Sequence, residues 1–137
     1  MKAAEQIPGL FGVGTDLVEI RRIERAYERW GDRLVDHLLM PGELEEFARS
    51  KRPVRYLAMR FAAKEALVKA LGTGFRQGMW LRDVGCCQEV SGKPFAIFSD
   101  KADALRRERG AGQAEISLTD EAGLIVAFAV MLRRPAG

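Results

Sequence analysis

The segment FAAKEALVKALGTG, residues 61–74, holds two charged side chains whose spacing could support chemistry. If the segment is a helix, Glu65 and Lys69 lie one turn apart on a face of alanines and aliphatic residues. The pair has two interpretations. It is either an exposed ion pair, which stabilises a helix by about 0.2–0.5 kcal/mol, or a carboxylate and an ammonium that face a ligand in the space left by the alanines. The spacing is compatible with both.

Asp16 offers a second carboxylate, at the end of a predicted strand where a helix is expected to begin. A residue there can cap the helix or hold a cation. Mg²⁺ usually takes one or two carboxylates from a protein and fills its octahedron with waters and substrate phosphates. Asp16 and Glu65 would meet that requirement, and Lys69 could neutralise phosphate charge. Gly72 and Gly74 are interpreted first as a helix stop, and second as backbone contacts for an anion.

A helical wheel separates the charges of this helix into two groups. Glu65 shares an arc with Ala62 and Val68, which makes its surroundings small and partly apolar. Arg60 and Lys64 point toward the other side and are expected among the solvated charges.

Hydrophobic periodicity and capping residues predict the elements that must position these side chains. Strands are predicted at residues 10–14, 81–90, 93–98, 114–119 and 124–132. Helices are predicted at residues 17–30, 33–39, from Pro41 onward, at 53–71 and at 99–110. Thr15 and Asp16 are the expected caps of the first helix, and Gly72 stops the long one. This order predicts an α+β fold with helices packed on a mostly antiparallel sheet.

The helix predicted at residues 17–30 carries an apolar arc and a basic stripe. The apolar arc consists of Ile20, Ile23, Tyr27 and Trp30. The basic stripe consists of Arg22, Arg25 and Arg29. The stripe is either a solvated face or a surface that orients an acidic partner.

Length and composition limit the classes of function. The 137 residues suit one domain, and 47% hydrophobic with 30% charged residues is typical of a globular protein. The apolar runs are shorter than the roughly 20 residues that cross a bilayer, and the N-terminus does not resemble a secretory signal. We therefore expect a cytoplasmic protein that does not bind membranes. A net charge of +3 is compatible with an acidic or phosphorylated partner.

The cysteines and the histidine exclude several kinds of site. Cys86 and Cys87 are adjacent, which disfavours a disulfide with ordinary geometry and lacks the spacing of a zinc site. We expect them to be structural thiols in a strand. His37 is the only histidine, so a site that needs two histidines is excluded.

Two longer motifs carry a resemblance to a known family. GVGTDLVEIRRI at residues 12–23 and RFAAKEALVKALGTG at residues 60–74 together resemble the holo-acyl-carrier-protein synthases, the short stand-alone 4′-phosphopantetheinyl transferases. GKP at 92–94 and SLTDE at 117–121 follow in the expected order. The resemblance covers about residues 10–132, which leaves residues 1–9 as an N-terminal extension. It implies the phosphopantetheinyl transferase fold, assembled as a homotrimer with coenzyme A bound between neighbouring subunits.

The resemblance also implies a reaction. The family transfers 4′-phosphopantetheine from coenzyme A to a serine hydroxyl of apo-acyl carrier protein, with Mg²⁺, and releases adenosine 3′,5′-bisphosphate in fatty acid biosynthesis. Carried over by motif, the catalytic residues are Asp16, Glu65 and Lys69, of which Asp16 and Glu65 would bind Mg²⁺ and Lys69 would contact the phosphate under attack. Either Glu65 or a metal-bound water would accept the serine proton.

The same comparison of motifs implies the binding surfaces. The residues that would line the coenzyme A cleft are Lys69, Gly72, Gly74, Gly92, Lys93, Pro94, Thr119 and Asp120. Many family members carry a histidine where this chain has Asp120, so no imidazole is available at that position. Arg22 corresponds to the arginine that grips the acidic carrier protein, and Arg25 and Arg29 extend the same stripe.

Two other functions are weighed against this one. The same chemistry could serve the carriers of polyketide or peptide synthases, although the broad-specificity members of the family are longer chains that contain both halves. A small basic RNA-binding module would also explain the arginine stripe. However, KPFAIF at residues 93–98 is a poor platform for stacking bases, so we expect no nucleic-acid partner.

Overall fold

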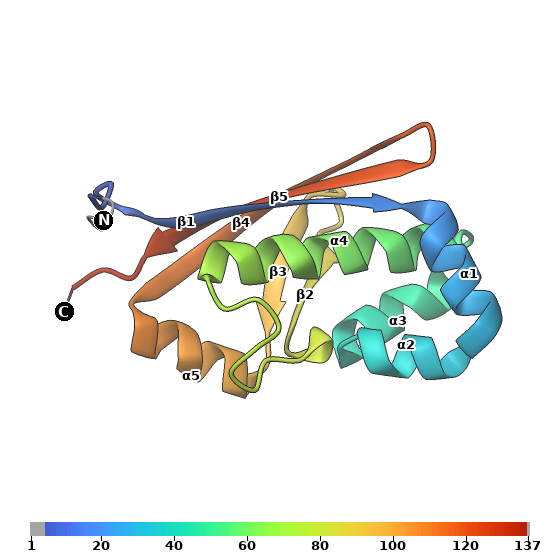
Figure 1. The fold of residues 1–137 in the computed structure, drawn as a ribbon, viewed down its shortest axis with the longest axis horizontal. Helices are drawn as coiled ribbons and strands as arrows, with labels where there is room; N and C mark the ends of the chain where they lie inside the picture. The colour runs from blue at the N-terminus through green and yellow to red at the C-terminus, as the bar shows by residue number, and fades with distance from the viewer. Residues whose placement is uncertain (1–4, 137) are drawn as a thin grey trace.

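The computed structural model describes residues 5–136, so the predicted extension over residues 1–9 lies partly outside the described residues. Its strands are β1 (Leu10–Glu19), β2 (Val84–Gln88), β3 (Pro94–Phe98), β4 (Ala111–Glu121) and β5 (Leu124–Arg133). Its helices are α1 (Ile20–Trp30), α2 (Asp32–Leu38), α3 (Pro41–Arg49), α4 (Pro53–Leu71) and α5 (Asp100–Arg109), with a 3₁₀ turn at Leu81–Asp83. The α+β prediction is confirmed (Figure 1).

The strands form two antiparallel sheets where the sequence predicted one. Strands β1, β5 and β4 lie side by side in that order, and β2 pairs with β3 in a separate hairpin. Side chains of Phe95, Phe98, Arg106 and Ala114 line a cavity of about 340 Å³ between β3 and β4.

Helix α4 is the centre of the fold and packs under the three-stranded sheet (Figure 1). Its alanines and leucines are buried almost all the way round the helix. Two glycines of β1 allow the close approach. A Cβ atom on Gly12 would lie 2.1 Å from the carbonyl oxygen of Ala70, and one on Gly14 would lie 2.1 Å from that of Ala66. The GVG motif therefore brings strand β1 against helix α4.

Strand β1 is longer than predicted, and Asp16 lies within it. The ladder with β5 continues to Glu19, which pairs with Leu124, so α1 begins at Ile20 instead of residue 17. The prediction that Thr15 and Asp16 cap the helix is wrong, because pairing with β5 outweighs the local preference of these two residues for a cap. The correction places the Asp16 carboxylate on a rigid strand.

The expected solvation of Arg60 and Lys64 is also wrong. Both side chains are buried, and they form ion pairs with Glu46 and Glu43 of α3. Burial lowers the pKa of Lys64, and the Glu43 charge opposes that shift. A helical wheel of α4 could not show this, because α3 lies elsewhere in the sequence and only its folded position supplies the partners.

The same carboxylates complete the free edge of strand β2. Glu43 accepts hydrogen bonds from the backbone N–H groups of Met40 (2.9 Å) and Cys86 (3.0 Å), while Glu46 accepts one from Gln88 (2.8 Å). Cys86 and its neighbour Cys87 are buried in this strand, and burial raises the pKa of both thiols to about 11. The prediction of structural thiols in a strand is confirmed.

The outer face of the three-stranded sheet has no helix over it among the described residues (Figure 1). Its exposed apolar side chains are Val13, Leu17, Leu124, Val126, Phe128 and Leu132. Leu17 alone leaves 61% of its surface accessible. Within residues 5–136 no helix is long and apolar enough to cross a membrane.

Candidate active site

Lys69 of α4 joins strand β1 and does not pair with the glutamate one turn before it. Its ammonium donates a hydrogen bond to the carbonyl oxygen of Thr15 (2.9 Å) and lies 3.3 Å from Asp16 Oδ1. The ion pairs between residues 5 and 136 do not include one between Lys69 and Glu65. The interpretation as a simple pair within the helix is therefore wrong, and the fold supplies Lys69 with a different carboxylate.

Glu65 lies at the same place, half-buried on the neighbouring turn of α4. Its pKa is raised, first because burial disfavours its charge and second because the Asp16 carboxylate is close. Lys69 and Arg22 act on this pKa in the opposite direction. The structure thus brings together Asp16, Glu65, Lys69 and Arg22 from β1, α1 and α4.

The donor set at this point fits a magnesium ion. Asp16 and Glu65 repel each other, as the raised pKa of Glu65 records, and a cation between them would relieve that repulsion. Two carboxylates are what Mg²⁺ commonly takes from a protein, with its other positions left to water and phosphate. Over residues 5–136 no group of three or more metal-binding side chains is present, so the protein would offer a pair.

An apolar cavity of about 360 Å³ opens beside Glu65. Its walls are His37, Phe61, Phe75, Gly78, Met79, Trp80 and Leu81. The sequence analysis did not identify this cavity. The aromatic residues of GTGFRQGMW, residues 72–80, were its only local signal, and that segment has no helical or strand period to place it.

A basic cavity of about 420 Å³ lies on the opposite face of α4. This basic cavity is defined by its five cationic side chains, which are Arg49, Lys51, Arg52, Arg55 and Arg60. Two carboxylates, Glu46 and Glu89, also line it. The sequence analysis missed it as well. The run RSKRPVR at residues 49–55 is rich in cationic residues, which was the only local indication of this cavity. The run does not show that its charges lie beside Arg60, on the second turn of α4.

Asp120 meets this basic cavity through Arg55. The Arg55 guanidinium donates two hydrogen bonds to the carboxylate, from Nε to Oδ2 (2.9 Å) and from Nη2 to Oδ1 (2.8 Å). Asp120 lies on β4 and Asp16 on β1, at opposite edges of the sheet with β5 between them. Strand β5 therefore lies between Asp16 and the carboxylate that Arg55 of the basic cavity contacts.

The glycines predicted to contact an anion are engaged locally. Gly72 takes the left-handed conformation (φ 85°) and ends α4, as predicted. The N–H groups of Gly72 and Gly74 both bond to the carbonyl oxygen of Val68, at 3.0 and 3.2 Å. These two N–H groups act as a helix stop in this structure and are not free for a phosphate.

The remaining predicted cleft residues lie on the β2–β3 hairpin and on strand β4. Gly92 turns the β2–β3 hairpin, Lys93 reaches Glu115 of β4 at 3.6 Å, and Pro94 begins β3. Lys93 and Pro94 line the cavity between β3 and β4. Thr119 is exposed on β4 beside Asp120.

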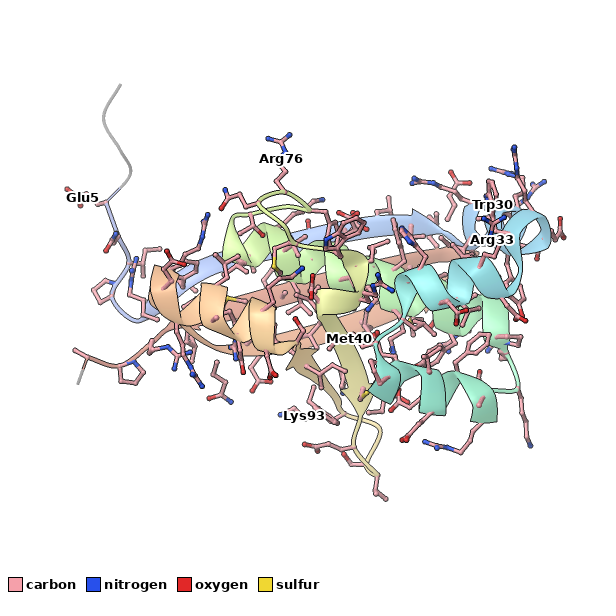
Figure 2. All side chains as sticks on the ribbon, turned by 90° about the horizontal axis from the view of Figure 1, so that it is seen from below. Glu5, Trp30, Arg33, Met40, Arg76 and Lys93 are labelled. Atoms are coloured by element: carbon pink, nitrogen blue, oxygen red, sulfur yellow. The ribbon has the colours of Figure 1, made fainter. Side chains whose placement is uncertain are left out.

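The basic stripe of α1 is exposed and continues onto α2. Arg22 stacks over the ring of Phe61 at 5.8 Å, while Arg29 and Arg33 lie over the ring of Trp30 at 5.0 and 5.9 Å. Trp30 was predicted in the apolar arc of α1 but is 47% exposed, because the helix ends there and the chain turns at Gly31. Figure 2 shows Trp30 and Arg33 together at one end of the molecule. Arg33 was not among the predicted residues.

Comparison with known proteins identifies the family of the chain. Residues 12–128 match the model of the 4′-phosphopantetheinyl transferase superfamily. A holo-[acyl-carrier-protein] synthase of Hamiltonella defensa is 41% identical over 122 residues, 89% of this chain and 97% of that protein. The crystal structure of the Neisseria meningitidis synthase superposes with a TM-score of 0.85 at 38% identity, covering 89% of this chain and 98% of that one. A Bacillus anthracis synthase in complex with coenzyme A superposes at 0.74 with 28% identity, covering 93% and 99%.

Proposed function

Because this chain belongs to the 4′-phosphopantetheinyl transferase superfamily, among the holo-[acyl-carrier-protein] synthases, we propose the following reaction. It transfers 4′-phosphopantetheine from coenzyme A to a serine hydroxyl of apo-acyl carrier protein and releases adenosine 3′,5′-bisphosphate. The serine oxygen bonds to the transferred phosphorus, and the bond from that phosphorus to the bridging oxygen of the pyrophosphate breaks. The bridging oxygen leaves with adenosine 3′,5′-bisphosphate. The observation that carries the proposal is the convergence of Asp16, Glu65 and Lys69 at one point of the fold.

Asp16 and Glu65 would hold Mg²⁺, which supplies charge neutralisation on the pyrophosphate and on the departing phosphate. Lys69 is half-exposed and would bind an equatorial oxygen of the phosphoryl group, where negative charge must be stabilised during transfer. Glu65 would also accept the proton of the serine hydroxyl, since a carboxylate placed at the point of attack can act as a general base.

We propose that the complete site forms between subunits of a homotrimer. The exposed apolar face of the β1–β5–β4 sheet supports association, because a patch of this kind on a small protein is typical of an interface. The position of Asp16 and of Asp120, the partner of Arg55, on opposite edges of this sheet supports a shared site. Asp16, Glu65 and Lys69 of one subunit would then face the basic cavity, Lys93, Pro94, Thr119 and Asp120 of its neighbour.

Coenzyme A carries a pyrophosphate and a separate 3′-phosphate, and each needs its own cations. The pyrophosphate would lie at Asp16, Glu65 and Lys69 with the metal. The 3′-phosphate would lie in the basic cavity, where five cationic side chains face two carboxylates. Arginines favour this ligand, because their planar fork bonds two phosphate oxygens at once.

The acyl carrier protein would dock on α1 and α2. Arg22, Arg25, Arg29 and Arg33 give this surface a positive charge, and exposed Trp30 gives it an apolar anchor. Arg22 is nearest the reaction, because its charge acts on Glu65. An acidic helix would meet this surface in a salt-dependent way.

We place the reaction in the cytoplasm and in fatty acid biosynthesis, and assign it to residues 10–132. The test is mass spectrometry of apo-acyl carrier protein incubated with the protein, coenzyme A and Mg²⁺. We expect the mass to increase by one phosphopantetheine, and the increase to be lost with EDTA and in Asp16→Ala. Carriers from polyketide and peptide synthases tested alongside identify the preferred acceptor. No mass increase on any carrier contradicts the proposal, and salt-sensitive retention of RNA would then favour the RNA-binding alternative.

A further inference from the structure

We propose that Asp120 is a positioning residue, which holds Arg55 at the basic cavity as a ligand for the 3′-phosphate of coenzyme A. The inference rests on the proposed function for the identity of the ligand. It assigns to this chain a residue pair, Arg55 and Asp120, that joins α4 to β4 across 65 positions of sequence.

The geometry of the pair leaves Arg55 able to bind. The bidentate contact uses Nε and one N–H of Nη2, so three of the five N–H donors of the guanidinium remain. About a third of each side chain is exposed, and Arg55 is part of the cavity wall whereas Asp120 is not. The bond from Arg55 lowers the pKa of Asp120, so the carboxylate stays charged and the fork stays closed through the neutral range.

A direct contact between Asp120 and the ligand would be unfavourable, because a carboxylate repels a phosphate. This is the reason for assigning Asp120 a role through Arg55. Two parallel hydrogen bonds fix the guanidinium plane more firmly than packing of a long, partly exposed side chain could. Without these hydrogen bonds the Arg55 side chain would sample several rotamers. The entropy lost when the ligand orders that side chain would then weaken binding.

The rest of the basic cavity has cations that other groups do not neutralise. Of its two carboxylates, Glu46 is already engaged by Tyr56, Arg60 and Gln88. Arg49, Lys51 and Arg52 take part in none of the ion pairs formed within residues 5–136. Among the described residues, Arg60 Nε is a buried donor without a hydrogen-bond partner. A dianionic phosphate monoester would satisfy these groups.

The experiment compares binding of coenzyme A with binding of 3′-dephospho-coenzyme A by calorimetry, in the presence of Mg²⁺. We expect the unmodified protein to prefer coenzyme A. Arg55→Gln should weaken coenzyme A binding about tenfold, the loss expected for one hydrogen bond between charged groups, and should leave dephospho-coenzyme A unchanged. Asp120→Asn should produce a smaller loss of the same selectivity, since it frees Arg55 without removing it.

The matched control is Lys101→Gln. Lys101 forms a partly exposed ion pair with Asp83 at 2.9 Å, outside the basic cavity, so this variant should keep the full preference for coenzyme A. Equal weakening of both ligands by Arg55→Gln or Asp120→Asn would show a merely structural pair and overturn the inference. Tighter coenzyme A binding by Asp120→Asn would overturn it too, because it would mean that the carboxylate repels the ligand.

Transfer to apo-acyl carrier protein, measured on the same samples, separates this inference from the proposed function. In one outcome, Arg55→Gln loses the preference for coenzyme A, but the unmodified protein transfers no phosphopantetheine. This outcome supports the phosphate site and contradicts the proposed reaction. Transfer by the unmodified protein, with selectivity intact in Arg55→Gln, contradicts the phosphate site and leaves the reaction standing.

Discussion

Lys69 Nζ lies 3.3 Å from Asp16 Oδ1, so an ammonium from helix α4 and a carboxylate from strand β1 meet at the candidate site. The Asp16 side chain is only 15% exposed, whereas that of Lys69 is 51% exposed. The strand therefore shields the carboxylate, while the ammonium remains accessible to an anion from solvent. This difference suits a metal ligand beside a phosphate ligand.

Replacing Glu65 by glutamine should separate stability from activity. The folded-state pKa of Glu65 is raised, so its charge disfavours the folded state, and the penalty is present at neutral pH. Without metal, Glu65→Gln should raise the free energy of unfolding at pH 7 by about 0.5 kcal/mol, a small effect because the site is partly solvated. The gain should vanish well below pH 4.5, where glutamate is protonated in both states. Urea unfolding in EDTA at both pH values measures it.

The same Glu65→Gln variant should lose phosphopantetheine transfer at every pH, because it removes a proposed metal ligand and base. Full activity in the variant would contradict the assigned role of Glu65, whatever its stability. Glu24→Gln, which changes an exposed glutamate of α1, is the matched control and should keep both properties.

Replacing Lys69 by glutamine should reduce kcat by about a hundredfold, as loss of a group that stabilises transition-state charge commonly does. It should also change the pH profile. Lys69 lowers the pKa of Glu65, so its removal should move the acid limb of the rate profile to higher pH. Rates measured from pH 5 to 8 at saturating Mg²⁺ test both effects; an unmoved acid limb would argue against Glu65 as the group that titrates.

Reversing the charge of Arg22 should affect the protein substrate and spare the nucleotide. Arg22→Glu is expected to weaken binding of acyl carrier protein about tenfold or more, because like charges would meet at the interface. Coenzyme A binding should stay near normal. Arg107→Glu on α5 is the control with the same charge change on a distant exposed helix. Equal losses for both substrates in Arg22→Glu would count against the docking surface.

A charge on the outer sheet face should disrupt the proposed trimer. Phe128→Asp places a carboxylate among exposed apolar side chains that a partner would bury, so the variant should elute as a smaller species and lose transfer while its circular dichroism stays native. Val90→Asp, at a more exposed apolar position in the turn between β2 and β3, should change neither. Light scattering after size-exclusion chromatography measures the mass, and a monomeric unmodified protein would contradict the proposal.

The sequence by itself determined the main helix and its end. Residues 53–71 were predicted as a helix and are α4, because Pro53 and Gly72 are local start and stop signals that depend little on the rest of the fold. The two thiols in a strand and the late hairpin were predicted for the same reason. The family motifs also predicted that Asp16, Glu65 and Lys69 belong to one site.

The tertiary structure decided which charges face each other. Pairing with β5 extended β1 beyond Asp16, and helix α3 buried Lys64, although both residues favour other environments locally. Lys69 met Asp16 across 53 positions of sequence, and Arg55 met Asp120 across 65. A local pattern contains no information about a partner so far along the chain, because that contact exists only once the sheet and α4 have packed.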